Sequence, residues 1–205
     1  MRKNFLKLAL PDVTLIIVDG VEYARAKTAL LHCTALCDFA DAKILTHLPA
    51  EDHFRHQIKP IESIYDYSEF VIKELANYFT TSHALMAQWD GFVWQTAMWS
   101  DEFLQYDYIG APWPDKFLVK GIPRHFNVGN GGFSLRSRRL QEFLRDDPNI
   151  IVHKVEDVAI CQLNRAYLEV KGFTFAPAEI ARRFSWELLD QQPAFGAHGR
   201  LRLDP

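Results

Sequence analysis

The feature that most constrains the fold is an unbroken run of aliphatic and β-branched residues, VTLIIV, at positions 13–18. A strand without polar side chains is buried on both faces, as in the centre of a parallel sheet covered by helices. The run ends at Asp19-Gly20, and residues 21–36 then show apolar side chains at helical spacing. A second apolar run at 42–46 follows, so the chain begins with a predicted β-α-β unit and a parallel strand pair.

Strands and helices continue to alternate along the chain. Residues 65–79 carry apolar side chains at helical spacing and predict a helix, and residues 84–90, ALMAQWD, predict a third buried strand. We therefore expect an α/β fold of the Rossmann-like type, with a mixed, mainly parallel sheet flanked by helices. A chain of 205 residues can bury one sizeable core, so we expect residues 1–205 to form a single domain.

The second half of the chain predicts shorter elements. Ser137 is a suitable N-cap for a helix through residue 144, and another helix is expected to begin near Glu156-Asp157. Residues 116–126 are expected to form a loop, and residues 195–199 an irregular tail. Short strands are predicted at 108–110, 133–136 and 173–176, and a short helix at 99–106.

The composition excludes several classes of function. The formal net charge is −3, which provides no general attraction for nucleic acid or for an anionic membrane. No apolar run reaches the length of a transmembrane segment, and the apolar part of the first residues is too short for a signal peptide. The three cysteines, Cys33, Cys37 and Cys161, are expected to be buried thiols in a reducing compartment. We therefore expect a cytoplasmic protein.

Two polar residues, Gln88 and Asp90, lie at the end of the third predicted strand. Ligands of open α/β sheets bind outside the carboxyl ends of the strands. Strand alternation places residues 88 and 90 on one side and Trp89 on the other, so both polar groups are expected to face one cleft. Oxygen ligands at such a place suit a divalent cation that holds a diphosphate. A hydrogen-bonded strand end without a ligand is the alternative.

Three segments together resemble the GT-A glycosyltransferases, which use nucleotide sugars and carry an Asp-any-Asp motif at the end of a central strand. The segments are QWD at 88–90, YIGAPW at 108–113 and GNGGFSLR at 129–136. The resemblance covers most of the chain and looks closest to a glycosyltransferase-like family of bacteria and fungi with the same motifs. It implies a nucleotide-diphosphate sugar as donor, with a UDP-sugar as first guess, and a saccharide or another hydroxyl compound as acceptor.

The resemblance also implies a divalent cation, Mn²⁺ or Mg²⁺, held by Asp90, His198 and Gln88. Gln88 stands where most GT-A enzymes have an acidic residue, so it brings an amide oxygen without charge, and metal independence stays open. His198 matches a histidine near the carboxyl terminus that closes over the nucleotide in many of these enzymes; a solvated tail histidine is the alternative.

The glycine-rich segment and the later VEDV segment, at 155–158, complete the implied site. Asn130, Gly131 and Gly132 are expected to line the donor pocket, since glycine lets the backbone approach a ligand closely; a tight turn is the simpler reading. VEDV resembles the segment of inverting β-1,3-glycosyltransferases that carries the general base. That role falls to Asp157, with Glu156 as an orienting neighbour. Two acids that merely favour a helix N-terminus are the alternative, and a retaining reaction also remains open.

Two further residues have an expected place in the site. Asp19 ends the first strand, where it can bind a nucleobase or ribose of the donor or simply cap the following helix. Trp113 lies between two prolines in a predicted loop and is expected to meet the acceptor sugar.

Two other functions compete with glycosyl transfer. A nucleotidyltransferase has a glycine-rich, basic loop after its first strand, whereas this chain has DGVEYARAK there. A non-catalytic module that binds a nucleotide or sugar is the second alternative, because Gln88 weakens the acidic motif.

Overall fold

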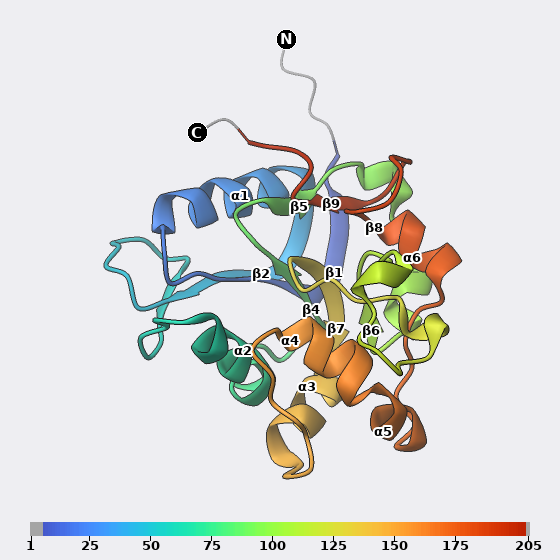
Figure 1. Ribbon diagram of the computed structural model, residues 1–205. Helices are drawn as coiled ribbons and strands as arrows, with labels where there is room; N and C mark the ends of the chain where they lie inside the picture. The colour runs from blue at the N-terminus through green and yellow to red at the C-terminus, as the bar shows by residue number, and fades with distance from the viewer. Residues whose placement is uncertain (1–5, 204–205) are drawn as a thin grey trace.

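The computed structural model describes residues 6–203 and centres on a six-stranded sheet in the order β3-β2-β1-β4-β7-β6 (Figure 1). Strands β1 to β4 are mutually parallel, β7 runs antiparallel to β4, and β6 antiparallel to β7. The strands are Leu8–Val18 (β1), Cys37–Thr46 (β2), Arg55–Gln57 (β3), His83–Ala87 (β4), Tyr108–Ile109 (β6) and Phe133–Ser137 (β7). The prediction of a mixed, mainly parallel α/β fold is confirmed. The ends of the predicted domain, residues 1–5 and 204–205, lie outside the described residues.

Strand β1 shows why the sheet is covered on both faces. Residues 13–18 are all almost fully buried. Leu15 and Ile17 pack with helix α1, Tyr23–Leu36, whereas Ile16 and Val18 pack with helix α2, Ile64–Lys73. Because alternate side chains of a strand point to opposite faces, an unbroken apolar run requires a helix on each side.

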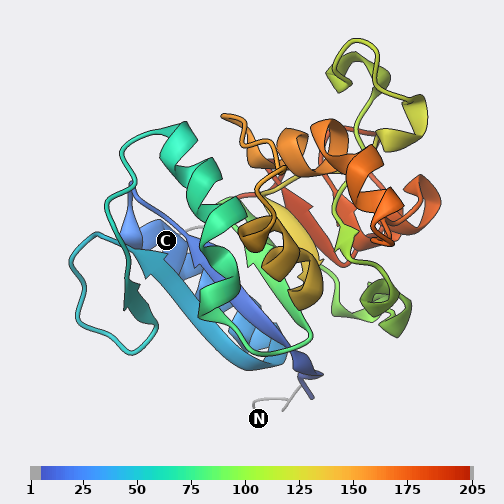
Figure 2. The same ribbon diagram turned by 90° about the horizontal axis from the view of Figure 1, so that it is seen from below.

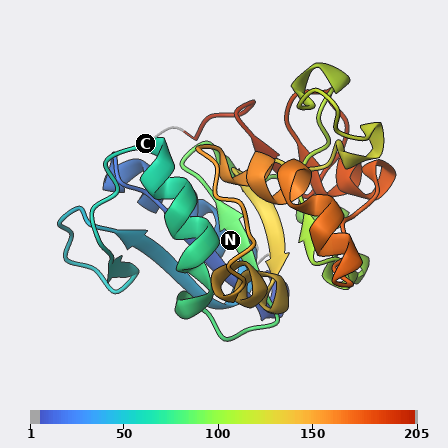
Figure 3. The same cartoon turned by 60° about the horizontal axis from the view of Figure 1, so that its bottom comes forward.

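The remaining helices lie mainly on the α2 face of the sheet, as Figures 2 and 3 show for α3 and α4. Ser137 caps α3 as predicted, since its hydroxyl oxygen accepts a hydrogen bond from Leu140 N. Helix α4 begins at Glu156 as predicted and continues into a π-helical turn, Ala159–Leu163. These helices are Arg138–Asp146 (α3), Glu156–Val158 (α4), Arg165–Val170 (α5) and Ala178–Phe184 (α6).

A second, three-stranded sheet corrects the prediction of an irregular tail. Strand β9, Gly196–His198, pairs with β5, Gly91–Val93, and with β8, Ser185–Trp186. A three-residue strand of glycine, alanine and histidine has no period-2 apolar pattern. Its pairing partners are distant in sequence, so only the tertiary structure reveals it.

Two other predicted elements also differ. The predicted strand at 173–176 is reduced to one bridge between Tyr108 and Phe175, because β6 ends after two residues. The helix expected at 99–106 is a short 3-10 segment, Asp101–Gln105. All three cysteines are buried free thiols, as predicted.

No helix within residues 6–203 combines the length and the apolar character needed to span a bilayer.

Candidate active site

A cavity of about 690 Å³ opens at the carboxyl ends of β1 and β4. Its other walls are formed by the glycine turn before β7, the start of α4, strand β9, and the start of α2 with residues 61–63 before it. The predicted site residues that line it are Asp19, Gln88, Gly131, Gly132, Glu156, Asp157 and His198. Parts of the chain that are more than 100 residues apart therefore meet at the place where open α/β sheets bind ligands.

Asp157 is held by two backbone donors. Its Oδ2 accepts from Gly131 N at 2.8 Å, and its Oδ1 accepts from Val158 N at 2.7 Å. Burial and then the negative charge of Glu156 raise the pKa of Asp157 to about 7, against the opposing effect of these two hydrogen bonds. A carboxyl group with this pKa can accept a proton near neutral pH.

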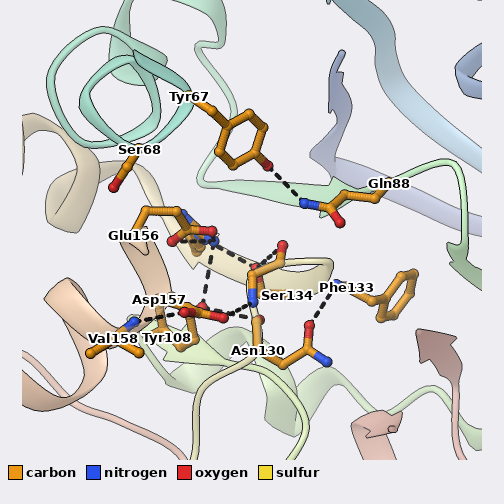
Figure 4. Close-up of polar contacts among 12 residues, drawn as sticks. Tyr67, Ser68, Gln88, Tyr108, Asn130, Phe133, Ser134, Glu156, Asp157 and Val158 are labelled. Atoms are coloured by element: carbon orange, nitrogen blue, oxygen red, sulfur yellow. Dashed lines mark hydrogen bonds and ion pairs between the residues drawn. The ribbon is translucent and has the colours of Figure 1, made fainter. Parts of the chain in front are cut away.

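Glu156 points away from solvent and pairs with a buried arginine beneath the cavity. Arg136 Nη2 lies 2.9 Å from Glu156 Oε1 and 3.1 Å from Oε2, and the arginine side chain is 0% exposed. Arg136 also donates from Nε to Ser134 Oγ at 3.0 Å. Figure 4 shows Glu156 next to Asp157, with Ser134 close by. The two neighbouring acids therefore differ in environment: Glu156 forms an ion pair with Arg136, whereas no arginine or lysine within residues 6–203 is in hydrogen-bond contact with Asp157.

The glycine turn needs its small residues. Asn130 has φ of 65°, a left-handed conformation that asparagine tolerates, and its Oδ1 accepts from Phe133 N at 3.1 Å. A Cβ on Gly131 would lie 1.9 Å from Glu156 Oε1, and a Cβ on Gly132 would lie 2.1 Å from His198 Nε2. Asn130 itself supports the turn from behind, since it does not line the cavity.

The predicted alternation at residues 88–90 is wrong. Strand β4 ends at Ala87, and Gln88 and Gly91 exchange backbone hydrogen bonds around a two-residue hairpin turn. Trp89 therefore does not pack away from the cavity but is 41% exposed and lines it. Gln88 also lines the cavity and donates from Nε2 to Tyr67 Oη at 3.1 Å, as Figure 4 shows.

Asp90 faces His198 rather than the main cavity. Asp90 Oδ1 lies 3.4 Å from His198 Nε2 and is buried without a hydrogen-bond partner. On the other side of the ring, His198 Nδ1 lies 3.0 Å from Glu187 Oε1. Burial opposes the charged imidazole, but the contacts with Asp90 and Glu187 raise the pKa of His198 to about 9. His198 is thus part of an ordered strand and has acidic neighbours on both sides.

Asp19 has the capping role that was one of its two expected alternatives. Its Oδ1 accepts from Val21 N at 2.7 Å and from Glu22 N at 2.8 Å, which fixes the turn before α1. The residue also lines the cavity, where a donor nucleotide can reach it.

Trp113 is only 6% exposed and lies outside the cavity. Its indole ring covers Gly129, where a Cβ would lie 1.9 Å from Trp113 Cη2. The structure does not bring this side chain to the other predicted site residues, because the YIGAPW segment folds into the core under the glycine turn.

Several residues of the site carry no sequence signal. Lys154 is the only lysine or arginine among the described residues that line the cavity. Tyr67 lines the cavity from α2, and its spacing in the sequence predicts only a core-facing position. Glu187 and Arg136 lie behind the cavity wall. Arg136 ends the GNGGFSLR segment, but its pairing with Glu156, 20 residues away, and the pairing of Glu187 with His198, 11 residues away, are seen only in the tertiary contacts.

Comparisons with known proteins agree with this fold. The sequence profile of a family described as "Protein of unknown function (DUF5672)" matches residues 52–198. No curated protein sequence matches the chain. A crystal structure of a glycosyltransferase involved in the glycosylation of the major capsid of PBCV-1 superposes with a TM-score of 0.50 at 12% identity, over 92% of each chain. At this identity the likeness is one of fold, and the fold is of the GT-A type.

Two other solved structures are more distant in shape. Galactosyltransferase LgtC, in complex with donor and acceptor sugar analogues, has a TM-score of 0.47 at 12% identity, over 90% of this chain and 86% of LgtC. The bifunctional IspDF from Campylobacter jejuni has a TM-score of 0.45 at 8% identity, over 80% of this chain. This chain spans 48% of the length of IspDF.

Proposed function

The chain belongs to the family described as "Protein of unknown function (DUF5672)", and we propose that it is a glycosyltransferase. In this proposal it transfers a sugar from a nucleotide-diphosphate sugar to a hydroxyl group, and residues 1–205 form one glycosyltransferase-like domain. The observation that carries the proposal is the cavity at the carboxyl ends of β1 and β4. Asp157, whose pKa is about 7, and His198 line this cavity on either side of the glycine turn, and Asp90 contacts His198 from outside the cavity.

Asp157 is the proposed general base of an inverting reaction. The acceptor oxygen attacks the anomeric carbon of the donor sugar while Asp157 takes the hydroxyl proton. The bond between that carbon and the diphosphate oxygen breaks, and its electron pair leaves with the nucleoside diphosphate. Gly131 N and Val158 N keep the carboxylate in place, and Arg136 keeps Glu156 from competing for the acceptor.

The Asp90-His198 pair fits a divalent cation, Mn²⁺ or Mg²⁺. No group of three metal-ligating His, Cys, Asp or Glu side chains occurs within residues 6–203, so this proposal needs phosphate oxygens of the donor as further ligands. Asp90 Oδ1 is a buried oxygen without a partner, which is an expected property of an unfilled ligand atom. Gln88 Nε2 is occupied by Tyr67, so its Oε1 is the atom that remains for a ligand. When bound, the cation stabilises negative charge on the leaving diphosphate.

The three free cysteines support a reducing compartment, which is why we also propose a cytoplasmic location.

A panel of nucleotide sugars with Mn²⁺, beginning with UDP-sugars, tests the proposed activity. We expect release of the nucleoside diphosphate from one donor and faster release when the right hydroxyl acceptor is present. Binding without turnover across the panel would instead favour a non-catalytic module. Pyrophosphate formed from a sugar 1-phosphate and a nucleoside triphosphate would identify a nucleotidyltransferase. NMR of the product anomer distinguishes inversion from retention.

The variant Asp90→Asn tests the proposed role of the pair. We expect it to abolish transfer and to weaken donor binding in the presence of Mn²⁺, since the amide lacks the charge that offsets a cation. Isothermal titration with the nucleoside diphosphate, with and without EDTA, measures the effect. Wild-type activity in Asp90→Asn would remove Asp90 from this role.

A further inference from the structure

Glu187 is the neighbour of His198 across the small sheet. Strands β8 and β9 are parallel, and Trp186 pairs with Ala197, so the next residue of each chain segment, Glu187 and His198, lie side by side. Glu187 Oε1 is 3.0 Å from His198 Nδ1. Glu187 does not line the cavity, whereas His198 does. The carboxylate therefore contacts the imidazole from the side remote from any substrate.

Two groups compete for His198 Nδ1. Asn130 Nδ2 lies 3.2 Å from this nitrogen, and Glu187 Oε1 lies 3.0 Å from it. The Glu187 carboxylate is a strong acceptor for a proton on Nδ1, whereas Asn130 Nδ2 can only donate to this nitrogen. The amide oxygen of Asn130 is not available as an acceptor, because it already accepts from Phe133 N. The proton on Nδ1 is therefore directed to Glu187.

The contact between Nδ1 and Glu187 leaves Nε2 as the ring nitrogen that can bind a cation. With Nδ1 donating to Glu187, Nε2 faces Asp90 Oδ1 at 3.4 Å, longer than a normal hydrogen bond. Adjacent ligands on an octahedral cation with bonds of about 2.1 Å lie about 3 Å apart. The spacing of the two atoms is close to that of a ligand pair, provided that Nε2 gives up its proton when the cation binds.

The backbone around Glu187 is itself held in place. Arg200 donates from Nε to the Glu187 carbonyl oxygen, and Trp186 Nε1 donates to Leu189 O at 2.9 Å. Glu187 Oε2 is buried and has no hydrogen-bond partner. Oε1 is therefore the oxygen through which Glu187 acts on its surroundings, and its contact is with His198 Nδ1.

From this geometry we infer that Glu187 is a positioning residue for a divalent cation: it orients the imidazole of His198 so that Nε2 and Asp90 Oδ1 present one two-atom ligand set. The inference rests on the metal-assisted form of the proposed function. It assigns a role to a residue that touches neither the cation nor the substrate.

Titration of the whole protein with Mn²⁺ alone, followed by the EPR signal of the free ion, tests this role without any donor or activity measurement. We expect Glu187→Ala to weaken Mn²⁺ binding about 10- to 100-fold, the range seen when such supporting groups are removed. Glu187→Gln should lose less Mn²⁺ affinity than Glu187→Ala, since the amide oxygen of glutamine can still accept a hydrogen bond from His198 Nδ1. The exposed Asp190, three residues further on, provides the matched control Asp190→Ala, which should bind like wild type.

The outcomes separate the inference from the proposed function. Wild-type Mn²⁺ affinity in both folded Glu187 variants overturns the inference, as does an equal loss in Asp190→Ala. Absence of Mn²⁺ binding by the wild type overturns it as well, while transfer measured in EDTA decides independently whether the protein is a glycosyltransferase. Thermal unfolding checks that each variant is folded. If Glu187→Ala does not fold, the Mn²⁺ affinity of Glu187→Gln is compared with that of wild type instead.

Discussion

Asp157 and Glu156 are consecutive carboxylic acids with opposite surroundings. Arg136 forms a buried ion pair with Glu156, while Asp157 borders the cavity and accepts from two backbone N–H groups. Burial and the adjacent negative charge of Glu156 raise the pKa of Asp157, which suits it to accept a proton. At the scale of single residues, this contrast is the main support for a base at position 157.

The variant Asp157→Asn isolates that role. We expect transfer to fall about 10²- to 10⁴-fold, the usual contribution of a general base, with donor affinity nearly unchanged. Steady-state kinetics and donor titration measure the two quantities. Asp38→Asn, an exposed change at the far end of β2, is the control and should behave like wild type. Full activity in Asp157→Asn would exclude position 157 as the base.

The pH dependence of kcat/KM follows from the same residue. Because the pKa of Asp157 is about 7 and a base must be unprotonated, activity should rise with pH through about 7 and then level off. Glu156→Gln removes the neighbouring negative charge that raises this pKa, so the midpoint should move to lower pH. Profiles of both proteins from pH 5 to 9 measure the shift. An unchanged midpoint in a folded variant would mean that Glu156 does not act on Asp157.

At the scale of elements, the glycine turn and β9 form one packed unit. His198 lies directly on Gly132, and β9 is joined to β5, which begins at the end of the hairpin turn that carries Asp90. The position of the imidazole is therefore set by a strand pairing and a backbone contact rather than by a mobile tail.

Gly132→Ala should disturb this unit. The new methyl group would lie 2.1 to 2.5 Å from three atoms of the His198 ring, so β9 or the turn must move. We expect at least a tenfold loss of Mn²⁺ affinity and of transfer, with most of the fold retained by circular dichroism. Gly121→Ala is the control: no atom lies within 4 Å of its Cβ position, and although a side chain at its φ of 92° strains the backbone, Gly121 does not line the cavity, so Mn²⁺ affinity and transfer should stay near wild type. Equal effects of the two changes would contradict a specific role for the turn.

At the scale of the whole molecule, strand β4 ties the parallel part of the sheet to β7. Its residue Leu85 is fully buried and pairs with Leu15 on one side and Leu135 on the other. The strand then leads directly into the turn that holds Gln88 and Asp90, so the core positions the cavity.

Leu85→Ala should lower the free energy of unfolding by about 2–5 kcal/mol, since it removes buried methyl groups and leaves a cavity. Urea unfolding measures this loss, and kcat of the folded protein at low temperature should stay near wild type. Val170→Ala, at a position 84% exposed, should change stability by less than about 0.5 kcal/mol. A similar loss at both positions would show that β4 is not the centre of the core.

The sequence by itself determined the α/β fold and most of its strands and helices. Apolar runs such as residues 13–18, helical spacing and the Ser137 cap are local patterns. Each of them depends only on residues that are close together in the sequence, so it can be recognised without the tertiary structure. The same patterns placed Gln88 at the end of a strand and Asp157 at the start of a helix, and these two ends meet at one edge of the sheet. The sequence therefore predicted that both residues line the same cavity, but not how they are oriented there.

Only the tertiary structure decided the details of the site. The hairpin turn at residues 88–91 separates Asp90 from Gln88, strand β9 brings His198 to Asp90, and Trp113 is buried under the glycine turn. The contact of Glu187 with His198 and the ion pair of Arg136 with Glu156 are encoded by no local pattern. The physical reason is that side-chain position depends on packing and on hydrogen bonds between distant segments, whereas the periodicity of a chain reports only which face of an element is buried.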